Sequence, residues 1–263
     1  MWQARFATPR AGELHLRPFL LGSTVCDCDH PAVASLSLEL VGRCTSVAEA
    51  AASVRAWVRE HIVYTLQDKS DLASQTLAKR EGMCTNKANL QVALLRAAGI
   101  PAGYSLVHVT KDAFAGPHTL PEVLERISPI TLHVFCSVYI PAEEPEHLAV
   151  EAAVEAPGAA AAAEAAAAGA GGAAEAAEAW PGERRPRPLG DFRCYDATER
   201  TGSAHLMEHV AETDETRYRA QWLRGPVLPP QGCLDPLLLV PIQSQISPAQ
   251  LAAQNALWRT HRI

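Results

Sequence analysis

From Pro31 to Ala98, apolar residues recur every three or four positions within several segments, which is the period of helices packed on one face. Asp29 is placed to cap the first of these patterns. The last of them is the longest without interruption, and Gly99 follows it as a left-handed cap. In chain order, helices are expected over Pro31–Val41, from Ser46 to Tyr64, over Leu72–Lys79 and over Cys84–Ala98.

Further along the chain, alternation of apolar and polar residues replaces the helical period and predicts strands. In the longest of these strands, His133 and Phe135 fall on the face opposite Val134 and Cys136. The expected strands are Gly103–Val109, Thr131–Ile140 and Asp191–Asp196, and a last helix is expected over Pro248–His261.

A segment rich in Ala and Glu separates the second and third of these strands. From Ala142 to Ala179, 20 of 38 residues are Ala, and the segment has no large apolar face to bury. We therefore expect residues 142–188 to be a disordered insertion at a hairpin tip. The formal charge of the chain is −6, but residues 142–182 hold eight Glu and no Asp, Lys or Arg. Without them the charge is +2, which does not indicate a nucleic-acid partner.

Composition also bears on compartment and domain organisation. No stretch approaches the roughly 18 apolar residues of a membrane helix, and the first residues do not resemble a secretory signal. We expect the seven Cys to be reduced thiols in a cytoplasmic protein, since their odd number does not suggest a disulfide framework. The expected parts are an N-terminal extension (1–28), one domain (29–200) that includes the insertion, and a C-terminal extension (201–263) packed on it.

Three residues on different predicted elements form a candidate catalytic site. Cys84 begins the longest helix, where unpaired backbone N–H groups and the helix dipole favour the reactive thiolate. A nucleophilic thiol needs a base, and His133 lies within a strand that can supply one. Asp196 ends the neighbouring strand, at a distance that allows it to orient the imidazole. The backbone N–H of Cys84 is our nominated donor to an oxyanion.

Two other runs contain residue types that bind metals. CDCDH (26–30) lacks both the usual spacing of zinc ligands and a second ligand pair. HLMEH (205–209) matches a zinc-protease pattern at three positions, but a solvated helix face is the better interpretation. We therefore expect no metal and no cofactor.

The residues around the three candidates resemble the transglutaminase-like superfamily. Gly82-Met83-Cys84 is similar to the G-x-C turn of that family, and the helix that it opens ends in the family-like run RAAGIPA (96–102). The strand at His133 resembles the family's histidine strand. YDAT (195–198) resembles its D-P-T strand, although Ala197 replaces Pro. The chain order Cys, His, Asp also agrees, and the resemblance covers residues 29–198 apart from the insertion.

This resemblance implies a papain-like α+β core, in which the catalytic helix packs on an antiparallel sheet and Cys84, His133 and Asp196 form a triad. The family's thiol attacks an amide, and water or an amine resolves the thioester, so hydrolysis and acyl transfer both stay open. The resemblance thus implies a peptide or small amide substrate, with an amine as acceptor for transfer. We expect no membrane partner, because the sequence has no apolar stretch of the length that a membrane helix needs. Asn86, Lys87 and Phe135 are candidate substrate-binding residues, although Lys87 also fits an exposed helix position. The competing hypothesis is a catalytically inactive module that binds a peptide or partner on the same fold.

Overall fold

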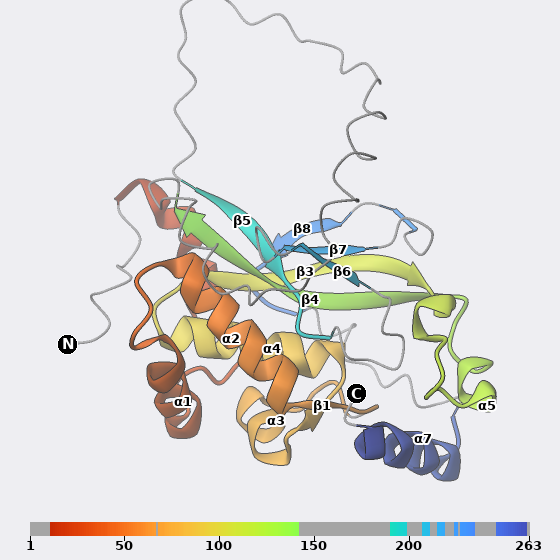
Figure 1. Ribbon diagram of the computed structural model, residues 1–263. Helices are drawn as coiled ribbons and strands as arrows, with labels where there is room; N and C mark the ends of the chain where they lie inside the picture. Colours follow the sequence, from red (N-terminus) through yellow and green to blue (C-terminus); the bar gives the residue numbers. More distant parts are fainter. Residues whose placement is uncertain are drawn as a thin grey trace, which may run out of the picture.

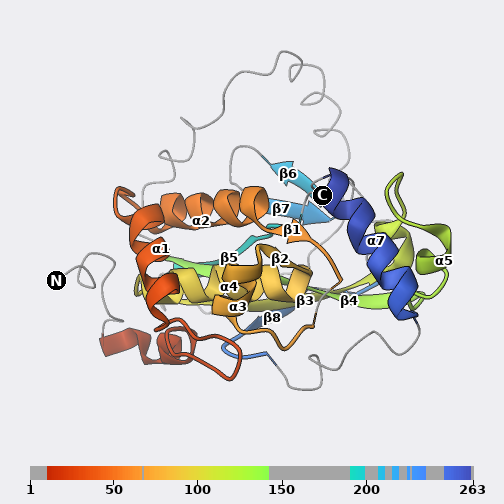
Figure 2. The ribbon, with the colours of Figure 1, turned by 90° about the horizontal axis from the view of Figure 1, so that it is seen from below.

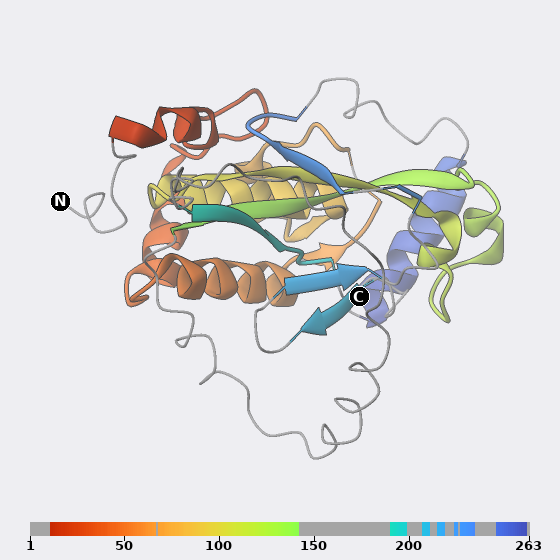
Figure 3. The same ribbon diagram turned by 90° about the horizontal axis from the view of Figure 1, so that it is seen from above.

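A four-stranded antiparallel sheet lies on a layer of helices, with strand order β5-β4-β3-β8 (Figures 1 and 3). The computed structural model describes residues 11–66, 68–141, 190–198, 207–210, 215–218, 224–225, 227–234 and 246–261. The α-helices are α1 (Pro31–Val41), α2 (Val47–His61), α3 (Ala73–Lys79), α4 (Cys84–Ala97), α5 (Pro121–Leu124) and α7 (Pro248–His261), with 3-10 helices at Ala11–Phe19 and Lys111–Phe114. The strands are β1 (Val63–Tyr64), β2 (Glu81–Gly82), β3 (Ala102–Thr110), β4 (Ile130–Pro141), β5 (Gly190–Tyr195), β6 (Met207–Val210), β7 (Glu215–Tyr218) and β8 (Leu228–Gln231). The predicted α+β fold, with a helix packed on an antiparallel sheet, is confirmed.

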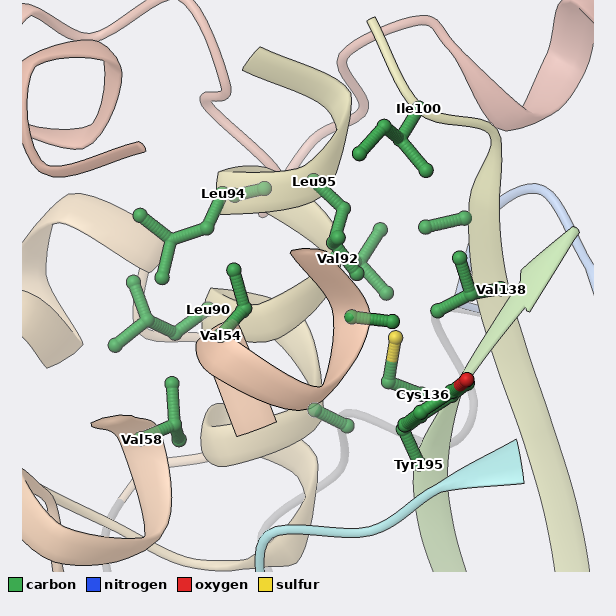
Figure 4. Packing of buried hydrophobic residues seen from close by; sticks show 14 of the residues in the cluster. Val54, Val58, Leu90, Val92, Leu94, Leu95, Ile100, Cys136, Val138 and Tyr195 are labelled. Carbon is green, nitrogen blue, oxygen red and sulfur yellow. The ribbon is translucent and has the colours of Figure 1, made fainter. Parts of the chain in front are cut away.

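Helix α4 occupies the centre of the helical layer, where it packs against α1, α2 and α3 (Figure 2). Every residue of α4 from Cys84 to Arg96 is buried. Leu90, Leu94 and Leu95 belong to the main hydrophobic cluster (Figure 4). Each fully buried Leu contributes about 1.5–3 kcal/mol to folding. The same cluster includes apolar side chains of the sheet, among them Leu106, Val134, Cys136, Val138 and Tyr195. This burial fixes α4, and therefore its first residue, against the sheet.

The capping residues and breaks in the sequence predicted most of the helix ends correctly. The predicted bounds of α1 match the structure, and Gly99 has the expected positive φ of 77°. The predicted cap Asp29 is wrong. His30 is the residue that precedes the helix, and its Nδ1 accepts a hydrogen bond from the Ala32 N–H at 3.3 Å. His30 takes this role because Pro31 occupies the first helical position, which makes the residue directly before it the cap.

Strands β4 and β5 form a continuous antiparallel pair on either side of the Ala/Glu segment. Their register runs from Cys136 opposite Tyr195 to Pro141 opposite Gly190. The predicted insertion, residues 142–188, lies outside the described residues. Because the pairing reaches Pro141 and Gly190, which flank the segment, the two strands are adjacent in space although they are far apart in the sequence.

We expect a protein in which Asn-Gly replaces residues 142–189 to keep the helices and the sheet. A two-residue Asn-Gly turn suits paired strands that end opposite each other, as Pro141 and Gly190 do. Loop-closure entropy falls by about 0.6 kcal/mol for each halving of loop length, so stability should stay equal or rise by up to about 2–3 kcal/mol. Thermal unfolding followed by circular dichroism measures this. A loss of cooperative unfolding would show that the segment is part of the folded structure.

Arg96 connects distant parts of the chain to the end of α4. Its guanidinium donates to the carbonyl oxygens of Leu21, Ala102 and Gly232, the last at 2.6 Å. A buried Arg with these partners holds an N-terminal and a C-terminal segment on the core, because each carbonyl would otherwise lose a charge-assisted hydrogen bond. The domain boundaries stay a prediction. Among the described residues, no helix is long and apolar enough to span a bilayer.

Candidate active site

Cys84 is the first residue of α4, and the turn before it is held by Asn86. The Oδ1 atom of Asn86 accepts a hydrogen bond from the Met83 N–H at 3.1 Å, and its Nδ2 donates to the Asp68 carbonyl at 2.8 Å. Gly82 is needed here because a Cβ atom at this position would lie 2.6 Å from the Cβ of Asn86. The thiol therefore projects from a tightly folded helix start, as the sequence predicted.

His133 and Asp196 meet where β5 ends. His133 Nε2 lies 2.5 Å from Asp196 Oδ2, and both side chains are almost completely buried. Oδ1 of Asp196 accepts hydrogen bonds from the Thr198 N–H at 2.7 Å and from its hydroxyl. Arg55 of α2 donates to the backbone carbonyl of Asp196 at 2.8 Å. The carboxylate is thus fixed by its own turn and by a helix, with one oxygen left for the imidazole.

The thiol of Cys84 forms a hydrogen bond with the His133 side chain. Since Nε2 of His133 binds Asp196, Nδ1 is the ring nitrogen that remains for the sulfur. The backbone N–H of Val134 also donates to the sulfur. This N–H is accessible because β5 ends opposite Cys136, so β5 does not cover the edge of β4 beside Val134. The structure therefore brings the three predicted residues together in the order thiol, imidazole, carboxylate.

The charges of these groups depend on one another. Burial raises the pKa of the Cys84 thiol, but the hydrogen bond and positive charge of His133, together with the Val134 N–H, lower it below the ordinary thiol value. Burial lowers the pKa of His133, but the charge and hydrogen bond of Asp196, with a contribution from Cys84, raise it to about 10. Burial raises the pKa of Asp196, and His133 and Thr198 bring it below its ordinary value. These directions favour a thiolate–imidazolium pair beside an ionised carboxylate.

Sequence reasoning missed the residues that surround the sulfur. Tyr64, Met83, Cys84 and Trp258 form one buried cluster. Burial raises the pKa of Tyr64 well above its ordinary value and the charge of Cys84 raises it further, while a hydrogen bond from the Cys84 backbone N–H opposes the rise. Tyr64 lies here because it pairs with Gly82 in the short parallel β1–β2 pair. A two-residue strand has no periodicity that a sequence pattern could reveal.

The three predicted substrate-binding residues have other partners in this structure. Lys87 is 1% exposed and donates from Nζ to the Ile62 carbonyl at 2.8 Å, so its interpretation as an exposed helix residue is wrong. Asn86 holds the helix start. Phe135 is buried with its ring centroid 6.1 Å from that of His133, which it helps to position. None of the three belongs to the substrate contacts that we propose.

The two metal-like runs give different outcomes. Residues 207–210 form strand β6, so the helical interpretation of HLMEH is wrong, and His205 lies outside the described residues. In CDCDH, the pKa of Cys28 falls to about 7, chiefly through a hydrogen bond with the thiol of Cys26. No group of three or more His, Cys, Asp or Glu arranged to hold a metal is present within the parts of the chain that the structure describes.

The fold and these groups define a class of α+β proteins in which a helix-start cysteine pairs with a strand histidine. Residues 34–152 match the model of the "Transglutaminase-like superfamily", the family that the sequence resembles. The matched segment contains Cys84 and His133, whereas Asp196 lies beyond it.

Two solved structures are similar to part of this chain at low sequence identity. A protein from Cytophaga hutchinsonii described as a "putative cysteine protease" is 22% identical over 48% of this chain and 39% of its own length, with a TM-score of 0.38. A "putative protease" from Parabacteroides distasonis is 13% identical over 48% of this chain and 23% of its own length, with a TM-score of 0.30. The chain thus spans well under half of each protein, and neither similarity bears on what it does. No curated protein matches the chain.

Proposed function

We propose that this protein is a transglutaminase-like thiol enzyme that acts on an amide or peptide bond through a thioester on Cys84. The observation that carries the proposal is the buried contact of Cys84 with His133, which in turn binds Asp196 at 2.5 Å. A purely structural cysteine needs neither a protonated histidine nor a fixed carboxylate. Strongly perturbed pKa values at converging side chains are typical of catalytic sites.

Each residue has a role in forming the thioester. The Cys84 thiolate attacks the carbonyl carbon, the S–C bond forms, and the carbonyl oxygen takes up the negative charge. His133 then donates its Nδ1 proton to the leaving nitrogen as the C–N bond breaks and the amine departs. Asp196 keeps Nε2 protonated and the ring oriented throughout, which is the role of the acidic member in such triads.

The same groups resolve the thioester. His133, now neutral at Nδ1, accepts a proton from water or from an incoming amine as that nucleophile attacks the acyl carbon. The C–S bond breaks, Cys84 returns as thiolate, and the imidazolium is restored. Water gives hydrolysis and an amine gives acyl transfer, so the triad supports either outcome.

Alkylation by iodoacetamide at pH 7, quantified for each cysteine by peptide mass spectrometry, tests the reactive thiol. The reagent is small, which suits a thiol that is only 4% exposed. We expect Cys84 to react faster than the buried thiols Cys26, Cys44 and Cys136. His133→Ala should slow Cys84 by on the order of tenfold or more, because losing the charge and hydrogen bond of His133 raises the pKa of the thiol, and each pH unit of that rise lowers the thiolate fraction about tenfold.

Cys28 is the internal control for this experiment. Its pKa of about 7 makes it a competing reactive thiol, and its low value derives chiefly from Cys26 rather than from the triad. Its alkylation rate should therefore be the same in His133→Ala, which also reports that the variant is folded. If Cys84 reacts no faster than Cys26, Cys44 and Cys136, the thiol-enzyme proposal is wrong and the inactive binding module is favoured.

A further inference from the structure

Helix α7 is held against the active site by side chains that bind backbone groups. Asn255 accepts from the Leu66 N–H at 2.9 Å and donates to the Leu66 carbonyl at 3.1 Å. Gln254 makes the same kind of double contact with the Leu120 N–H and the His118 carbonyl, at 2.7 and 2.8 Å. These paired bonds fix the rotation and the height of α7, which lies beside β1 and outside the segment that matches the family (Figure 2).

This placement puts Trp258 in the buried cluster that contains the reactive thiol. Its ring meets that of Tyr64 edge-on, with centroids 5.2 Å apart and planes at 74°, and both belong to the buried cluster of Cys84. Trp258 is 1% exposed, yet its indole N–H has no hydrogen-bond partner among the described residues. A buried donor without a partner costs about 1–3 kcal/mol, and such a group in a folded protein requires an explanation.

The backbone N–H of Cys84, which the sequence suggested as the donor to an oxyanion, already has an acceptor. In this structure the backbone N–H of Cys84 donates to the Tyr64 hydroxyl. The indole N–H of Trp258 is therefore a free donor in the same cluster as the sulfur, where an attacked carbonyl develops negative charge.

We propose that Trp258 is a substrate-binding residue whose indole N–H donates to the carbonyl oxygen of the acyl group as Cys84 attacks it. This inference rests on the proposed function. It explains why α7 is fixed by four side chain–backbone hydrogen bonds, since a donor to an oxyanion must be held in place before the reaction. It also gives α7 a role in catalysis.

The variant Trp258→Phe distinguishes the effect of the indole N–H from the effect of ring packing, because Phe keeps an aromatic ring against Tyr64 but has no hydrogen-bond donor. Two probes of the same thiol are compared in the full chain. With p-nitrophenyl acetate, the Cys84 sulfur attacks the carbonyl, an oxyanion forms, and p-nitrophenolate leaves as the acetyl thioester is made. With iodoacetamide, the sulfur displaces iodide at the methylene carbon and no oxyanion forms.

We expect Trp258→Phe to slow acylation of Cys84 roughly 100-fold, as removal of one oxyanion donor does elsewhere, and to leave its alkylation rate unchanged. Cys84→Ala gives the background acylation of the other thiols. Trp57→Phe is the matched control: Trp57 stacks on His61 with ring centroids 4.6 Å apart, and neither rate should change. The ratio of the two rates at one thiol is independent of the folded fraction, so a destabilised variant still gives an answer.

Equal slowing of both reactions would assign Trp258 a packing role and overturn the inference. Unchanged acylation would also overturn it. A wild-type Cys84 that fails to react preferentially with iodoacetamide contradicts the proposed function itself, whereas a reactive Cys84 with an unselective Trp258→Phe effect contradicts only the role of Trp258.

Discussion

Asp196→Asn should slow the acylation of Cys84 by p-nitrophenyl acetate by on the order of 10³-fold or more, while the fold is retained. The Thr198 N–H and hydroxyl donate to Oδ1 of Asp196, and the same bonds will hold the carbonyl oxygen of Asn at that position. The amide NH₂ then faces His133 Nε2 and donates to it. His133 must place its proton on Nδ1, so it cannot serve as base toward the thiol, and the loss from this wrong tautomer in a related triad is about 10⁴-fold.

Loss of the negative charge acts in the same direction. The charge and hydrogen bond of Asp196 are the main reasons that the pKa of His133 is raised to about 10, against burial that lowers it. Without them a neutral imidazole no longer stabilises the thiolate. Asp191→Asn is the matched control, because this exposed carboxylate lies on β5, the strand that precedes Asp196. Acylation of Asp196→Asn at the wild-type rate would show that this residue does not act on His133.

Much of the triad could be predicted because each member lies on an element with a strong local signal. Cys84 comes two residues after Gly82 and opens the longest apolar helix pattern, and His133 lies in a strand with clear alternation. Asp196 was harder to associate with them, since the long Ala/Glu segment separates it from His133. Antiparallel pairing resolves this separation, because Tyr195 lies opposite Cys136 and places Asp196 beside the edge of β4.

The rest of the site depends on contacts that leave no pattern in the sequence. The bounds of α7 were predicted, but its position relies on Gln254 and Asn255, whose amides bind backbone groups far away in the chain. Such polar contacts have no period. Nothing in the sequence therefore indicated that Trp258 lies in the Cys84 cluster.

Lys87 shows how tertiary structure overrides residue preference. Lysine is almost never fully buried without a partner, so exposure was the natural expectation. The partner is the Ile62 carbonyl at the end of α2, where the helix dipole places partial negative charge. This acceptor becomes visible only when α2 and α4 are packed together.

The pH dependence of Cys84 alkylation should shift strongly when His133 is removed. In the wild type, the pKa of Cys84 lies below the ordinary thiol value, so the reactive thiolate persists down to that lowered pKa and is lost only in more acidic solution. In His133→Ala the favourable charge and hydrogen bond are gone and burial, which raises the pKa, dominates. The acid limb of the alkylation profile should therefore move upward past the ordinary thiol value, and the rate at a fixed lower pH should fall about tenfold for each pH unit of this shift.

The alkaline side of the profile separates the two roles of His133. Its pKa of about 10 means that the imidazolium persists through neutral pH and is lost as the pH rises through that value. Alkylation by iodoacetamide needs no proton, so its rate should not fall there. An anilide such as p-nitroacetanilide has a leaving nitrogen that must be protonated, and its acylation of Cys84 should decline above about pH 10. Cys28, with its own acid limb near pH 7, provides the reference within each sample. Superimposable Cys84 profiles in the wild type and His133→Ala would mean that the thiol and the imidazole are neighbours without functional coupling.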